Sequence, residues 1–378
     1  MAVASTTNPA DFANRRQTYF SRELLKATEF NLRMAQFAQR KSLPANSGTN
    51  TIRFFRPRKA RKATGGMGPQ NLTEGVTALH NSEVSVGYVD CALNQRGDDF
   101  TITDLVKATD ILDTVQLYTK TVGQDAALDF DTICTASILG NASTALLAKA
   151  LGLGAAQTTL YNSNRQYGKA TANCFERFAG VVNANPGNSA ADFASLAALS
   201  KAQGKFTRLE HLRALTQLRA NDVHAPDGKV YPVITPPEVM FDIRQDGTLV
   251  AAMTQRDNAK LYKWEEFEMD GGAFIESTNP WQESAGVGYG NYDGNGTIFS
   301  LLYLGDEAFG VPKLSNNVAG GDPTAPKMII LDSPDKSDPY NQRVVGAWKC
   351  FYGAILILTS DASDVPRVCA LRVQSSFQ

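Results

Sequence analysis

The sequence predicts an α+β protein in which two extended arms leave a packed body. Apolar residues recur every three or four positions over residues 103–139, a pattern typical of a long helix. Short apolar or alternating runs at residues 51–58, 84–88, 230–234 and 298–304 are typical of strands. The first 62 residues are basic and the remainder is acidic, which indicates that the N-terminal region lies against something negative.

The composition is that of an ordinary globular protein with a sizeable core. Of the 378 residues, 43% are hydrophobic and 20% are charged, and this length suits two or three domains. The longest apolar run, near residues 351–358, is far shorter than the roughly 20 residues of a membrane span. The N-terminus lacks the basic and apolar regions of a signal peptide. We therefore expect a cytosolic product without a membrane partner.

Residues that carry chemistry are sparse and scattered. The five cysteines form no CxxC pair, and the three histidines have no metal-ligand spacing. The glycine-rich segment 286–296 lacks the flanking elements and the Gly-Lys-Ser/Thr sequence of a phosphate-binding loop. No nucleophile motif occurs, and the clustered carboxylates are expected to be solvated. The sequence therefore predicts no metal, no cofactor and no enzymatic activity.

An N-terminal arm is predicted over residues 1–48. An amphipathic helix begins near Tyr19, with Phe20 and Leu24 on its apolar face, and Pro44 and Gly48 close the segment. Such a helix cannot bury its apolar face alone. It must lie on another element of the chain or on another subunit.

An extended loop is predicted over residues 49–100. A strand begins at Thr51, and Pro57 confines it to an edge or makes it end there, because proline donates no ladder hydrogen bond. A glycine-rich tip at 65–69 precedes the returning strand. Since an isolated two-stranded hairpin is marginal in water, this loop also needs a partner surface.

A basic run on this loop supplies the candidate contact residues. Its charge suits a clamp on the acidic body of a neighbouring copy, which we favour because the hairpin needs support. Contact with nucleic acid, with Phe54 and Phe55 stacking on bases, and a merely solvated arm are the alternatives. We expect these side chains to be exposed, and we include Glu74 on the return path. The candidate inter-subunit contacts are Arg53, Arg56, Arg58, Lys59, Arg61, Lys62 and Glu74.

The helix over 103–139 is predicted to be a continuous structural spine. Thr103 suits its N-cap, Gly140 its end, and no proline interrupts it. At 1.5 Å per residue it would be about 55 Å long. A coiled coil is disfavoured because Thr119 and Asp129 fall on the heptad seam. Farther along, we expect a helix over 206–220, a strand over 230–234, a helix over 238–244, and strands over 298–304, 342–358 and 367–373.

The order of these elements resembles the tailed-bacteriophage coat fold of the Hong-Kong-ninety-seven type. It is similar, more narrowly, to the capsid family of an enterobacterial short-tailed virus with a virion RNA polymerase. The resemblance covers residues 18–373 and thins over 141–204. The segments that carry it are 43–44, 48–56, 72–76, Asp104, Leu128-Asp129, 233–236, 242–244, 274–277, 304–310 and 338–342.

The resemblance implies a major capsid protein and a division of the chain. Copies would form pentamers and hexamers of an icosahedral shell around double-stranded DNA, assembled in the host cytoplasm and found in the virion. A separate scaffolding protein, a portal and a decoration protein are the implied partners, and Lys59 or Lys62 could serve in crosslinking. The implied parts are an N-terminal arm 1–48, an extended loop 49–100, a peripheral domain 101–204 with spine helix 103–139, an axial domain 205–335 and return strands 336–378.

The sequence leaves two other functions open as alternatives. An encapsulin-like nanocompartment shell would share the fold and would enclose cargo enzymes. A basic-armed DNA-binding protein would bind duplex DNA as a small oligomer with a steep salt dependence. A hydrolase is disfavoured because nucleophile motifs are missing.

Overall fold

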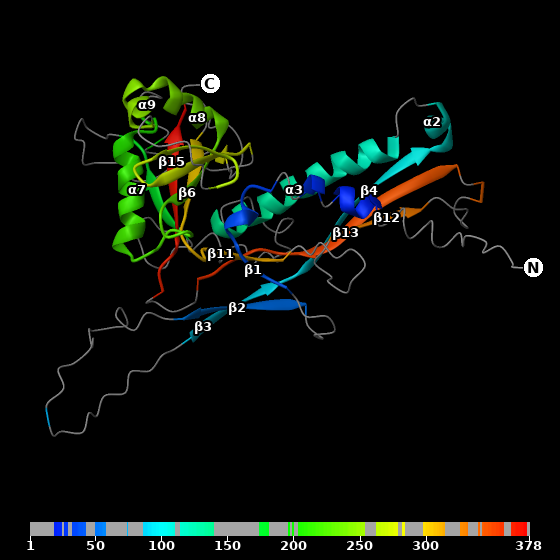
Figure 1. Ribbon diagram of the computed structural model, residues 1–378, viewed down its shortest axis with the longest axis horizontal. Coiled ribbons are helices and arrows are strands. Elements are labelled where there is room, and N and C mark those ends of the chain that lie inside the picture. The colour runs from blue at the N-terminus through cyan, green and yellow to red at the C-terminus, as the bar shows by residue number, and fades with distance from the viewer. Residues whose placement is uncertain are drawn as a thin grey trace, which may run out of the picture.

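A computed structural model describes most of the elements predicted above. The described residues are 19–24, 26–28, 32–42, 50–57, 74, 86–109, 114–139, 174–180, 196, 199, 203–253, 262–278, 282–283, 298–313, 326–331, 339–340, 342–358 and 364–375. The chain forms an elongated half, which contains the longest helix, and a lobe built on a larger sheet (Figure 1).

The lobe contains a seven-stranded sheet, and we call it the sheet lobe. Its strand order is β5-β15-β10-β6-β8-β7, with β9 paired to β10. β5 and β6 run parallel to β15 and β8, respectively, and the other pairs are antiparallel. The strands are β5 (Phe175–Phe178), β6 (Tyr231–Thr235), β7 (Glu265–Met269), β8 (Gly272–Glu276), β9 (Gln282–Glu283), β10 (Ile298–Leu304) and β15 (Val368–Gln374).

Both faces of this sheet are covered, which explains why its central strands are mostly apolar rather than alternating. All residues of β6, β10 and β15 are buried. One face packs against α7 (Arg208–Ala220), α8 (Pro237–Gln245) and α9 (Gly247–Met253), and the other joins the core of the elongated half. The helices predicted over 206–220 and 238–244 and the strands predicted over 230–234, 298–304 and 367–373 are confirmed.

The elongated half consists of α3 (Thr114–Leu139) and the three-stranded sheet β12-β13-β4. β4 (Asn94–Thr103) and β13 (Arg343–Tyr352) are antiparallel over all ten residues, and β12 (Lys327–Leu331) pairs with the other edge of β13. α3 packs on this sheet through Phe130, whose ring stacks on Tyr352 at 4.1 Å and meets Trp348 edge-on at 5.8 Å. This helix is about 39 Å long at 1.5 Å per residue.

The prediction of one continuous helix over 103–139 is wrong at its N-terminal end. α2 (Asp104–Thr109) follows β4 directly, and its axis is turned away from that of α3 (Figure 1). Residues 110–113 lie outside the described residues. The apolar pattern misled because Leu105 and Val106 are exposed, at 69% and 45%, and do not continue the buried stripe of α3.

The described part of the N-terminal arm lies on its own chain. Residues 19–24 and 26–28 are helical, and Phe20 and Leu24 are buried in the core that also contains α3. Gly123 permits this close approach, because a Cβ there would come within 2.8 Å of the Ala27 Cβ. The Thr28 hydroxyl donates to the Gly123 carbonyl at 3.2 Å. The apolar face predicted to need a partner therefore finds one on α3.

A buried histidine links α7 to the sheet of the lobe. His211 is fully buried; its Nε2 lies 2.9 Å from the Met269 carbonyl and its Nδ1 lies 3.0 Å from the Tyr303 hydroxyl. Since a carbonyl only accepts, Nε2 carries the proton and Nδ1 accepts from Tyr303. Burial, the largest cause, lowers the pKa of His211 to about 4. The neutral imidazole is therefore the form that the fold requires.

Acid should destabilise the sheet lobe through His211. The unfolded chain binds this proton near pH 6.5 and the folded chain only near pH 4, so stability is lost as pH falls through that window, by up to about 3 kcal/mol. We expect His211→Gln to be less stable than the wild type at pH 7 and to show a shallower loss between pH 6.5 and 4.5. Urea unfolding at both pH values measures this difference; equal slopes for the two proteins would contradict it.

Candidate functional site at the arm junction

Of the described candidate contact residues, Arg53 and Arg56 lie on the extended hairpin. β2 (Thr51–Pro57) and β3 (Val86–Ala92) form the predicted antiparallel pair, and Pro57 is the last residue of its strand. Glu74 is an exposed turn residue. Arg58, Lys59, Arg61 and Lys62 lie outside the described residues, so the structure places only Arg53, Arg56 and Glu74 of the candidate set.

The hairpin has one buried and one exposed face. Along β2, Ile52, Phe54 and Arg56 are buried, whereas Arg53 and Phe55 are exposed. Because successive side chains of a strand point to opposite faces, Arg53 and Arg56 lie on different sides of the hairpin. The two arginines therefore have different roles.

Arg53 belongs to the exposed face, where it ties the two strands together. Its guanidinium donates to both carboxylate oxygens of Asp90 on β3, at 2.7 and 2.8 Å, and lies 4.0 Å from the ring centroid of Tyr88. The Arg53 hydrogen bond, the largest cause, lowers the pKa of the Asp90 carboxyl. Lys41 from the N-terminal arm adds a hydrogen bond to the Arg53 carbonyl at 3.1 Å.

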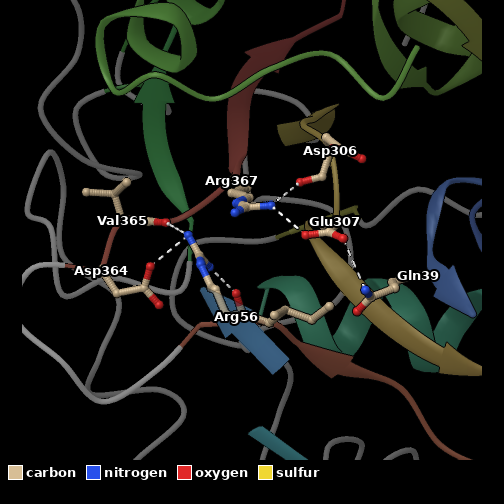
Figure 2. A network of polar contacts seen from close by, with 8 residues as sticks. Gln39, Arg56, Asp306, Glu307, Asp364, Val365 and Arg367 are labelled. Carbon is tan, nitrogen blue, oxygen red and sulfur yellow. Dashed lines mark hydrogen bonds and ion pairs between the residues drawn. The ribbon is translucent and has the colours of Figure 1, made fainter. Parts of the chain in front are cut away.

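Arg56 belongs to the buried face, and its side chain enters the body of the chain (Figure 2). It pairs with Asp364 at 2.7 Å and donates to the Val365 carbonyl at 2.6 Å and to the Ile357 carbonyl. The side chains of Arg56 and Asp364 are only 6% and 11% exposed. Burial, the largest cause, lowers the pKa of Arg56 to about 10, so the guanidinium stays charged at neutral pH.

The same network continues to the N-terminal arm. Arg367 donates to the Asp306 carbonyl at 3.0 Å and to Glu307 at 3.2 Å, and Gln39 donates to the other Glu307 oxygen at 3.1 Å (Figure 2). Glu307 has a φ of 48°, a left-handed conformation that is uncommon for a non-glycine residue. Its two partners hold this turn in place. The network thus joins both arms to the segment that leads into β15.

Strand pairing and packing complete the junction. β1 (Gln39–Lys41) runs parallel to β11 (Phe309–Pro312), which also pairs with β14 (Ile355–Leu356). The ring of the fully buried Phe54 lies on Gly310 of β11, where an added Cβ would come within 2.5 Å of it. Glycine is therefore needed at position 310 for the hairpin to approach the sheet.

A second anchor holds the N-terminal arm to α3. The buried carboxylate of Asp131 accepts hydrogen bonds from the backbone N–H groups of Arg33 and Met34, at 2.9 and 3.2 Å. These groups lie just before the short 3-10 helix Ala35–Phe37. Burial, the largest cause, raises the pKa of Asp131 to about 6, against the effect of the backbone N–H groups. Arg33 also lies 3.7 Å over the Trp264 ring.

Groups suited to metal binding or thiol chemistry are scarce in the described part of the chain. Within the described residues, no group of three or more His, Cys, Asp or Glu side chains has a geometry that could hold a metal ion. The five cysteines are all buried, and burial raises the pKa of Cys91 to about 12, which keeps it a thiol at neutral pH. No helix in the described part of the chain is long and apolar enough to cross a membrane.

Comparison with solved structures relates this arrangement to phage capsids. The capsid of Ralstonia phage GP4 matches with a TM-score of 0.61 at 15% identity, covering 90% of this chain and 87% of that one. The capsid asymmetric unit of cyanophage Pam1 matches with a TM-score of 0.57 at 13% identity, covering 92% and 93%. The chain has the phage coat fold. No protein-family model matches the sequence, and neither does any curated protein with which it was compared.

The fold corrects the expectation that all the basic candidates are exposed. Arg56 is 5% exposed because strand alternation places it with Ile52 and Phe54 against the body. Substitution of Arg56 is therefore expected to affect stability, unlike substitution at an exposed position. Sequence inspection missed Asp364 as the partner of Arg56, and Arg367 as the partner of Glu307, because nothing in the local sequence marks these pairs.

The two arginines of β2 should differ sharply in their effect on stability. Arg56→Ala breaks the buried ion pair with Asp364 and should lower the free energy of unfolding by about 3–5 kcal/mol. Arg53→Ala, three residues away on the same strand, breaks an exposed pair and should change it little. Urea unfolding of both variants makes the comparison. Similar losses of unfolding free energy in the two variants would show that the burial of Arg56 does not determine its contribution to stability.

Proposed function

We propose that this chain is the major capsid protein of a tailed phage. Copies would assemble into pentamers and hexamers of an icosahedral shell that encloses double-stranded DNA. The observation that carries the proposal is the match to two phage capsid structures over about nine-tenths of the chain. The role is structural, without turnover of a substrate.

The exposed face of the hairpin is the part we assign to contact with a neighbouring subunit. Phe55 and Tyr88 face each other across the strands and are 53% and 56% exposed. Aromatic side chains of this kind are enriched in protein interfaces. Arg53 lies beside them, and the remaining candidates Arg58, Lys59, Arg61, Lys62 and Glu74 belong to the same loop. Arg56 is left out because it is occupied inside its own chain.

Further partners follow from the same role. A scaffolding protein, a portal, a decoration protein and packaged DNA are proposed, with assembly in the host cytoplasm and a final place in the virion. The narrower relation to the short-tailed enterobacterial virus rests on the sequence segments alone and stays a prediction.

The alternatives have less support. An encapsulin-like shell would need a cargo enzyme that co-purifies with it. A DNA-binding arm would need free basic groups, yet the two arginines of the basic run that the structure describes are paired, Arg53 with Asp90 and Arg56 with Asp364.

Electron microscopy and light scattering of the purified protein test the proposal. We expect closed polyhedral particles, or pentamers and hexamers that close into particles when a candidate scaffolding protein is co-expressed. A monomer or dimer that does not change with concentration, salt or scaffold would overturn it. Arg53→Glu is expected to reduce particle yield while the protein stays folded, and Lys229→Glu, at an exposed position just before β6, serves as the charge control.

A further inference from the structure

Two positive charges lie close together where the arms meet the body of the chain (Figure 2). The guanidinium of Arg56 enters from the hairpin, and that of Arg367 lies on the segment that leads into β15. Burial lowers the pKa of Arg56 to about 10, and the charge of Arg367 adds to this effect because like charges repel. The carboxylates of Asp364 and Glu307 act in the opposite direction. Both carboxylates therefore stabilise the buried charge of Arg56.

Glu307 is held from two sides. Its Oε2 accepts a hydrogen bond from Arg367 at 3.2 Å, and its Oε1 accepts one from Nε2 of Gln39 at 3.1 Å. Gln39 is the first residue of β1, so the second contact comes from the N-terminal arm. Because the Glu307 side chain is 40% exposed, burial alone does not fix its position. Loss of the Gln39 contact would free one side of this carboxylate.

Gln39 and Arg56 belong to different arms and do not contact each other. Among the described residues, no hydrogen bond or ion pair joins their side chains, and Glu307 lies between them (Figure 2). Gln39 positions a carboxylate that in turn stabilises the charge of Arg56. The polar network thus provides an indirect connection from one arm to the other.

We propose that Glu307 couples the two arms, so that the N-terminal arm and the hairpin dock on the body cooperatively. While Gln39 holds the Glu307 carboxylate, the charge of Arg56 is well compensated and the hairpin stays docked. When the arm leaves, the carboxylate loses one of its two partners, and the hairpin is held less tightly. Because a coupling free energy is reciprocal, release of the hairpin must also loosen the arm. The inference goes beyond the proposed function and does not depend on it, since both arms belong to one chain.

Hydrogen exchange of the full-length chain, at a concentration where copies stay apart, tests the coupling. An isolated hairpin is marginal in water, so the amides of β2 report whether the hairpin is docked. The amides of β1 report the N-terminal arm, because β1 pairs with β11 on the body. We expect Gln39→Ala to speed exchange in β2 about fivefold, a coupling of about 1 kcal/mol at about 1.4 kcal/mol per factor of ten. Exchange in β6, which is buried in the sheet lobe, should not change.

The reciprocal experiment changes the hairpin and measures the N-terminal arm. Arg56→Lys keeps the charge and is milder than Arg56→Ala, and it should speed exchange in β1 by a similar factor. Two matched controls should leave the opposite arm unchanged. Gln36→Ala removes another glutamine of the arm, whose hydrogen bond is to the Lys263 carbonyl, and Arg53→Ala removes the arginine on the exposed face of β2.

Two other contacts also join the arms, and the experiment must separate them from Glu307. Lys41 donates to the Arg53 carbonyl at 3.1 Å. Phe54 packs on Gly310, which is the partner of Gln39 in the pairing of β1 with β11.

Glu307→Gln removes the charge and leaves these two contacts in place. We expect it to speed exchange in β1 and β2 together, and we expect Gln39→Ala to have no further effect on β2 in that background. An effect of Gln39→Ala on β2 that persists in the Glu307→Gln protein would overturn the role of Glu307. Unchanged exchange in β2 of the Gln39→Ala single variant would overturn the coupling itself. Neither result would affect the proposed capsid role, which is tested by particle formation.

Discussion

The buried guanidinium of Arg56 needs a counter-charge and hydrogen-bond acceptors around it. This requirement determines where both arms lie against the body of the chain. A buried guanidinium is tolerated only when a counter-charge and hydrogen-bond acceptors surround it. Asp364 and the carbonyls of Val365 and Ile357 meet that need, so the segment before β15 must lie where β2 enters the body. Arg367 then reaches Glu307, and Glu307 reaches Gln39 of the N-terminal arm.

The polarity of charge along the chain is partly neutralised within one molecule. The first 62 residues carry 13 basic and three acidic residues, and the remaining residues carry 24 basic and 35 acidic ones. Arg53 and Arg56 find their partners in the acidic remainder of the same chain. An asymmetry of this kind therefore does not by itself indicate nucleic acid. It also explains how arms without a core of their own stay attached to a body.

The elements that sequence predicted well are those with strong periodicity. β10 occupies the predicted residues, and the helix and hairpin strands differ from prediction mainly at their ends. The burial of Arg56 was signalled too, since it alternates with Ile52 and Phe54, but its charge suggested solvent instead. Its partners could not be predicted, because Ile357 and Val365 are 301 and 309 positions away in the sequence and only the tertiary fold brings them to Arg56. The same holds for Asp131, a charged residue on the buried side of α3 that caps a distant segment.

The long-range contacts that hold the two arms determine the order in which a newly made chain can fold. Gln39 and Arg56 leave the ribosome early, yet Glu307 follows Gln39 by 268 residues, and Val365 follows Arg56 by 309. Domains form as units during synthesis, but contacts this distant in sequence must wait for both ends. Both arms therefore settle only after the segments that contain Glu307, Ile357 and Val365 have been synthesised. A prematurely terminated chain that lacks β15 and the segment before it also lacks Asp364 and Val365, the partners of Arg56. In such a fragment the hairpin is not held in place and cannot be presented to a neighbouring subunit.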